Sequence, residues 1–110
     1  GSESKLLKGL ELGCTGIITA TTNVTGALAR DVFDKYQNNL STDSNEKLCK
    51  VRSVFENYNL ISALHTFMSQ KDVQFKNLIP PLKLLNDKDK NELFSNLEQV
   101  DFNINMIKAA

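Results

Sequence analysis

Apolar residues at helical spacing recur along most of the chain and predict a mostly helical protein. The first group lies in residues 2–13 and consists of Leu6, Leu7, Leu10 and Leu12. Ser2 or Ser4 can cap the start of this helix, and Gly13 can end it, because a helix favours a hydroxyl at its first turn and glycine after its last.

Four further segments complete the helical pattern. The stripe of the second helix consists of Leu28, Val32, Phe33 and Tyr36, and Asp31 and Lys35 are spaced for an ion pair along it. Helices are then expected over about residues 45–57 and 60–70. The prolines of residues 80–81 force an extended stretch, and Asn86 can cap a last helix with apolar residues Leu93, Phe94, Leu97 and Val100 turned inward.

Ile17 and Ile18 interrupt this pattern with consecutive apolar residues, which is typical of a parallel strand covered on both faces. A single strand leaves backbone donors and acceptors unpaired on both edges. We therefore expect the chain to be incomplete or to be completed by another chain. The alternative is a small helical domain in which these two residues are buried coil.

The residues after this predicted strand are rich in hydroxyl and amide groups. Thr19, Thr21, Thr22 and Asn23 lie in the loop that leads into the next helix. Ligands of α/β proteins bind at the carboxyl ends of strands, so the loop is a candidate binding site. Thr21, Thr22 and Asn23 also suit a simpler role in capping the helix that follows.

Three motifs stand in a fixed order along the chain: Gly1-Ser2-Glu3-Ser4, then G-C-T-G-I-I-T-A-T-T-N-V at residues 13–24, and Ile79-Pro80-Pro81-Leu82. Together with the leucine-rich helix between the first two, they resemble the C-terminal part of the dihydrodipicolinate synthase / N-acetylneuraminate lyase family. The resemblance extends from Gly1 to about Val100. Gly1 and Ser2 can also be a cloning scar, although the family-like residues after them favour a native turn.

This resemblance implies an α/β fold, the (β/α)8 TIM barrel, which needs roughly 250 residues. The 110 residues here would supply the seventh helix, eighth strand and eighth helix, followed by a C-terminal helical extension, so that the chain itself is mostly α. On this basis residues 1–40 form the last βα units of the barrel and residues 41–110 form the extension.

The resemblance also implies an activity for the complete protein. Members are class I aldolases and lyases that form a Schiff base between a lysine and pyruvate, with an aldehyde or sugar acid as the other substrate, and they need no cofactor. Their catalytic lysine precedes the region matched here, so this segment is expected to be inactive alone. The family context further implies a homotetramer in which this segment contacts the rest of its barrel. The two widely spaced cysteines, interpreted as reduced thiols, favour a cytoplasmic protein.

Five residues of this segment would border the substrate by resemblance: Gly1, Glu3, Ile18, Thr19 and Ala20. Glu3 stands where members that bind sugar acids place an acidic residue for substrate hydroxyls, but it equally suits the N-terminus of a helix. Ile18 would border pyruvate or belong to the barrel core. Ala20 replaces the serine of sialic-acid lyases, which counts against N-acetylneuraminate as the substrate.

Composition limits the other functional classes. The formal net charge is zero, with 13 basic and 13 acidic residues, which is unlike a nucleic-acid-binding domain. No apolar run approaches the ~20 residues of a membrane span.

Cys14 and Cys49 are expected to be reduced, buried and structural, and His65 has no neighbour at metal-ligand spacing. The alternative to the aldolase segment is a helical interaction module without an active site.

Overall fold

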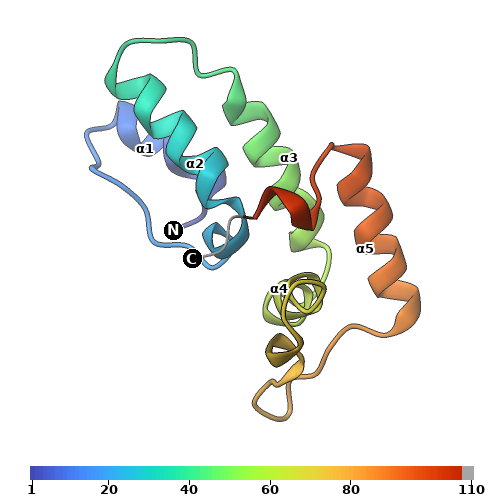
Figure 1. Ribbon diagram of the computed structural model, residues 1–110. Coiled ribbons are helices and arrows are strands. Elements are labelled where there is room, and N and C mark those ends of the chain that lie inside the picture. Colours follow the sequence, from blue (N-terminus) through green and yellow to red (C-terminus); the bar gives the residue numbers. More distant parts are fainter. Residues whose placement is uncertain (108–110) are drawn as a thin grey trace. The chain divides into compact units, whose positions relative to one another are not determined.

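The computed structural model describes residues 1–107, and these are built mainly from helices (Figure 1). The α-helices are α1 (Leu6–Glu11), α2 (Thr22–Gln37), α3 (Ser44–Glu56), α4 (Leu60–Met68) and α5 (Asp87–Gln99), and the short 3-10 helices are η1 (Glu3–Lys5), η2 (Val73–Lys76) and η3 (Ile104–Met106). The chain divides into two compact units, the first comprising Gly1–Arg52 and the second beginning at Ser53, so that the boundary falls within α3.

The first helical segment begins and ends where the sequence predicts. The Ser2 hydroxyl accepts a hydrogen bond from the backbone N–H of Ser4 at 3.3 Å, which caps η1. Gly13 follows the helix with a φ of 96°, a left-handed conformation that glycine adopts at little cost. Leu12 is the exception to the expected apolar face, because its side chain is 72% exposed.

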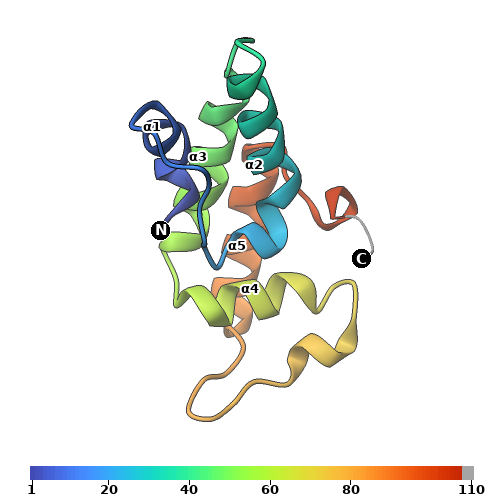
Figure 2. The ribbon, with the colours of Figure 1, turned by 90° about the vertical axis from the view of Figure 1, so that its left-hand side faces the viewer.

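The segment between α1 and α2 is extended, and Figure 2 shows it running from the end of one helix to the start of the other. The predicted strand at Ile17 and Ile18 is wrong for this chain, because no strand is present in residues 1–107. A strand requires a hydrogen-bonded neighbour. The alternative of buried coil is wrong for Ile18 as well, since its side chain is 93% exposed.

The core of the first unit joins α1, α2 and the start of α3. Its buried members are Leu6, Leu10, Ala29, Val32 and Leu48, and Ile17, Leu28, Phe33 and Tyr36 are among the half-buried residues packed against it. Figure 1 shows α1 and α2 side by side. The Tyr36 hydroxyl donates to the backbone oxygen of Leu10 at 3.2 Å, which ties the two helices together at one end.

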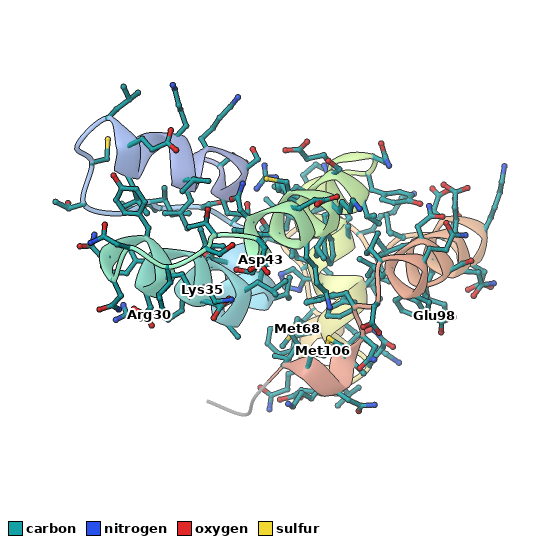
Figure 3. The ribbon with its side chains drawn as sticks, turned by 90° about the horizontal axis from the view of Figure 1, so that it is seen from above. Arg30, Lys35, Asp43, Met68, Glu98 and Met106 are labelled. Atoms are coloured by element: carbon teal, nitrogen blue, oxygen red, sulfur yellow. The ribbon has the colours of Figure 1, made fainter. Side chains whose placement is uncertain are left out.

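Lys35 forms the ion pair that its spacing predicts. Its Nζ lies 3.1 Å from Asp31, one turn earlier on α2, and 3.4 Å from Asp43, just before α3. Figure 3 shows Lys35 and Asp43 turned toward each other. The lysine thus bridges α2 and the polar connection that leads into α3.

Packed aromatic rings form the core of the second unit. Phe67 of α4 packs edge-on against Phe55, with ring centroids 5.6 Å apart, and stacks with Phe102 at 5.7 Å. Leu93 and Leu97 of α5 are also buried. Phe94 and Val100, which were expected to point inward, are only half-buried.

Asparagine side chains cap α4 and α5, and the cap of α5 is the one that the sequence predicts. The Asn86 side chain accepts from the Asp89 N–H at 2.8 Å, which confirms the predicted start of α5, and Asn59 accepts from the Ser62 N–H at 3.0 Å. The Thr66 hydroxyl accepts from the Leu85 N–H at 3.0 Å. The extended stretch after the prolines is therefore anchored to α4.

The two cysteines depart from expectation. Both are free thiols, but Cys14 is exposed and Cys49 is half-buried, so the prediction that both are buried is wrong. Burial, followed by the nearby charge of Glu3, raises the pKa of the Cys49 thiol. Its Sγ lies 3.8 Å from the Ser4 carbonyl oxygen, to which the thiol donates. Cys49 is accordingly held in the unreactive, protonated form.

None of the helices in residues 1–107 has the length and apolar character needed to cross a membrane.

Candidate functional site

Glu3 lies at the centre of a polar cluster inside the first unit, and its side chain is fully buried. One carboxylate oxygen, Oε1, accepts from the Thr19 hydroxyl at 3.0 Å and from Nη1 of Arg52 at 2.9 Å. The other, Oε2, accepts from the Thr25 hydroxyl at 2.7 Å and from the Thr21 hydroxyl. We call these five residues the Glu3 network.

Arg52 of α3 contacts two threonines of the network as well as Glu3. Its Nη1 also lies 3.1 Å from Oγ1 of Thr19 and 2.7 Å from Oγ1 of Thr21. Each of these two hydroxyls accepts from the guanidinium and donates to the carboxylate. The threonines therefore bridge an ion pair that is already in direct contact, and only 13% of the arginine side chain is exposed.

The surroundings of Glu3 keep its carboxyl group ionised. Burial by itself raises the pKa of this carboxyl, but hydrogen bonds from Thr21, Thr25, the Glu3 backbone and Thr19 together lower it by more, so that the net pKa is below its ordinary value of 4.5. Hydrogen bonds to a carboxylate favour its charged form, and a guanidinium beside it acts in the same direction. The cluster is therefore a buried anion held by donors at neutral pH.

Gly1, two residues before Glu3 in sequence, lies against the extended segment at Ile18. A Cβ atom at Gly1 would come within 2.2 Å of the Ile18 carbonyl oxygen, whereas even weak carbon–oxygen contacts need about 3.3–3.6 Å. The sequence expectation was that this glycine lets the backbone approach the substrate. The close approach seen in this chain is to Ile18, another residue of the predicted site.

An open hollow of about 710 Å³ lies beside these two residues. Its wall consists of Gly1, Ser2, Lys5, Gly9, Cys14, Thr15, Gly16, Ile17 and Ile18. Of the five predicted site residues, Gly1 and Ile18 thus line the hollow. Thr19 and Glu3 lie in the Glu3 network instead, and Ala20 is exposed in the loop between them and α2.

The side chains of Thr22 and Asn23 donate hydrogen bonds to backbone carbonyl oxygens within the loop itself. The Thr22 hydroxyl donates to the Thr19 carbonyl oxygen and the Asn23 amide donates to that of Ala20, both at 2.8 Å. Thr21 occupies the N-cap position of α2, but its side chain makes no capping hydrogen bond and donates to Glu3. The expected capping role therefore fails for the Thr21 side chain, which belongs to the network.

Two members of the network were missed from the sequence, namely Thr25 and Arg52. A signal for Arg52 was present, because Leu48, Val51 and Phe55 place it at an apolar-stripe position of α3, where a charged residue is out of pattern. Such a residue is buried only when it is paired.

The described residues contain no group of three histidine, cysteine or acidic side chains that could hold a metal ion. Nδ1 of His65 lies 2.7 Å from the Phe75 carbonyl oxygen, and the two rings are in edge contact. His65 therefore links α4 to η2.

Comparison with known protein families gives a match over most of the chain. The sequence model described as "Dihydrodipicolinate synthetase family" matches residues 1–100. Neither the curated proteins nor the solved structures contain a match to the chain.

Proposed function

The chain belongs to the dihydrodipicolinate synthetase family, and from this premise we propose that it forms the C-terminal part of a lyase or aldolase that acts through a lysine–pyruvate Schiff base. The observation behind this proposal is the family match, which includes all three motifs of the sequence resemblance. In the proposal, residues 1–40 complete a (β/α)8 barrel and residues 41–110 form a helical extension.

The extended segment supports the barrel context. Ile18 is 93% exposed and no strand pairs with it in the described residues. An exposed apolar segment with unpaired backbone groups is a template for pairing with another strand. In the complete protein the upstream strands of the barrel would cover Ile18 and pair with its backbone.

We propose that Gly1, Ile18, Thr19 and Ala20 form one wall of the pyruvate site, with Glu3 behind them. Gly1 and Ile18 are in close backbone contact, and Thr19 and Ala20 continue the same segment toward α2. The carboxyl ends of barrel strands are where substrates bind in this fold. The second substrate in the proposal is a small aldehyde or a sugar acid.

The catalytic lysine in this proposal lies upstream of the chain. A Schiff-base lysine needs a desolvated setting or a neighbouring cation that lowers its pKa. Lys5 is the lysine on the wall of the hollow, and it is exposed. It lacks the burial that imine formation at neutral pH requires.

Borohydride trapping tests the proposal directly. The lysine amine adds to the ketone carbon of pyruvate with loss of water, and borohydride delivers hydride to the resulting imine, which fixes the three-carbon unit on the protein. Mass spectrometry of the full-length protein should show one such adduct on an upstream lysine. The present chain alone should show none. An untrapped full-length protein would overturn the Schiff-base proposal and favour the helical interaction module.

We further propose that the full-length protein is a homotetramer, as the family resemblance implies, and that it is cytoplasmic, which its free cysteines support. Native mass spectrometry of the purified full-length protein should give the mass of four subunits. A monomer at micromolar concentration would contradict this assignment.

A further inference from the structure

We infer that Glu3 is a positioning residue, which fixes the Gly1–Ile18 wall and the Thr19–Thr21 loop through its buried network and does not itself bind substrate hydroxyls. This inference rests on the proposed function, since it assigns the role of one residue in the same site. The sequence resemblance alone left Glu3 with two roles, a ligand for substrate hydroxyls or a carboxylate at a helix N-terminus.

The hydrogen-bonding capacity of the carboxylate is the first argument. An ionised carboxylate accepts at about four lone-pair positions. Thr19, Thr21, Thr25 and Arg52 provide four donors, two on each oxygen. A substrate hydroxyl would have to displace one of them.

Displacement would be unfavourable because the displaced donors are themselves buried or nearly so. Thr21 is fully buried and its hydroxyl donates to the Glu3 carboxylate, whereas the buried Thr25 hydroxyl also lies 3.1 Å from the Thr21 carbonyl oxygen. A buried donor without a partner loses the free energy of its hydration and gains nothing in return. Arg52 would also lose the anion that compensates its charge in a site where it is only 13% exposed.

The origins of the donors are the second argument. Thr19 belongs to the extended segment, Thr21 is the N-cap residue of α2, Thr25 lies in the first turn of α2, and Arg52 belongs to α3. The Glu3 carboxylate therefore links η1 to the extended segment, to α2 and to α3. Because Gly1 lies two residues before Glu3, the same network fixes where the Gly1 backbone meets the Ile18 carbonyl oxygen.

The loop that would face substrate is thereby held at both of its ends. Thr19 is bound to Glu3 through its side chain, and its carbonyl oxygen accepts from Thr22. Thr21 is bound to Glu3 and Arg52. Ala20 lies between two anchored residues, and its own carbonyl oxygen accepts from Asn23. Loss of the carboxylate charge would release this loop without removing any group from the substrate-facing wall.

Two readouts on the full-length protein separate positioning from direct binding. The variants are Glu3→Gln, which keeps the size of the side chain, and Glu11→Gln, an exposed control in α1. Hydrogen exchange of the backbone amides in residues 19–25 reports the loop. The rate of borohydride trapping with pyruvate reports the wall, and pyruvate has no hydroxyl for Glu3 to bind.

Positioning predicts that Glu3→Gln exchanges the loop amides about 10- to 100-fold faster than wild type, the factor that corresponds to loss of a hydrogen bond to a charged group. It also predicts slower trapping by pyruvate, whereas Glu11→Gln matches wild type in both. Wild-type exchange and trapping in Glu3→Gln, with weaker binding only of hydroxylated substrates, would overturn the inference and make Glu3 a direct ligand.

A milder variant keeps the test decisive if Glu3→Gln does not fold. Thr25→Val removes one donor to Oε2 and lies in α2, outside the substrate-facing wall. It should accelerate exchange of the loop amides by a smaller factor, and unchanged exchange would contradict the network. If wild type itself is not trapped by pyruvate, the proposed function fails, while hydrogen exchange still decides whether Glu3 positions the loop.

Discussion

The two units of the chain bury different chemistry. The first encloses an ion pair bridged by threonine hydroxyls at Glu3 and Arg52, whereas the second encloses the rings of Phe55, Phe67 and Phe102. Aromatic packing tolerates many arrangements of similar volume, but a buried carboxylate requires each donor at a defined position. The buried hydrogen bonds therefore make the first unit the one whose side chains are held at defined positions.

The extended segment strengthens this contrast. In the first unit, Ile18 is exposed beside a glycine whose close approach to the backbone admits no side chain. In the second unit, the aromatic core is bounded by α4 and α5, with both of these helices capped by asparagine. We interpret the first unit as the part that contributes to a site and the second as structural support.

The largest expected effect on stability lies in the aromatic core. Phe67→Ala should lower the free energy of unfolding by about 3–5 kcal/mol, because it removes a buried ring that contacts two others. Urea denaturation of the full-length protein measures this. Ile61→Ala is the matched control on α4, where the side chain is 47% exposed, and an equal loss there would contradict the assigned core.

The next largest effect should come from breaking the ion pair. Arg52→Gln leaves a buried carboxylate without its cation, which typically costs 3–5 kcal/mol. We expect the low end, about 3 kcal/mol, because Arg52 retains 13% exposure. A double-mutant cycle with Glu3→Gln should give a coupling of at least about 1 kcal/mol. Additive effects of the two substitutions would mean that the pair contributes nothing as a pair.

The pH dependence of stability should distinguish the two units. The folded-state pKa of Glu3 is below its ordinary value of 4.5, so the folded protein favours the ionised form. The contribution is fully present above the unfolded-state pKa and is lost as the pH falls through the folded-state pKa. Acid unfolding should be less steep in Glu3→Gln than in wild type, and Phe67→Leu should leave the steepness unchanged.

The smallest effect on stability is expected at Ile18. Ile18→Asp in the isolated chain should change the free energy of unfolding by no more than about 0.5 kcal/mol, because the side chain is 93% exposed. In the full-length protein the same carboxylate would repel that of pyruvate, and pyruvate binding should fall. Leu12→Asp, at 72% exposure, is the control, and equal pyruvate affinity in both variants would remove Ile18 from the site.

Helix positions could be predicted from the sequence because each rests on local chemistry. The Ser2 and Asn86 caps and the Asp31–Lys35 pair depend on residues within one or two turns of each other. The strand predicted at Ile17 and Ile18 does not form in residues 1–107, because a strand needs hydrogen-bonding partners that are distant in sequence. The 3-10 turn at Val73–Lys76 has no apolar periodicity and was missed.

The Glu3 network was only partly predictable. Glu3, Thr19 and Thr21 drew attention through the motif and the polar loop, but the sequence did not show that they meet. Glu3 and Arg52 each share a stripe with buried leucines, namely Leu6 and Leu10 in one case and Leu48 in the other. Two opposite charges on two apolar faces are a signal for a buried pair, and the sequence alone contains it.

The crystal structure of the full-length protein with its aldol product bound would test the central claim, that Glu3 holds the site wall without touching substrate. We predict that Oε1 and Oε2 still accept from Thr19, Thr21, Thr25 and Arg52, and that no product atom lies within about 3.2 Å of either oxygen. A product hydroxyl bound to Glu3, with Arg52 or a threonine turned away, would contradict the account.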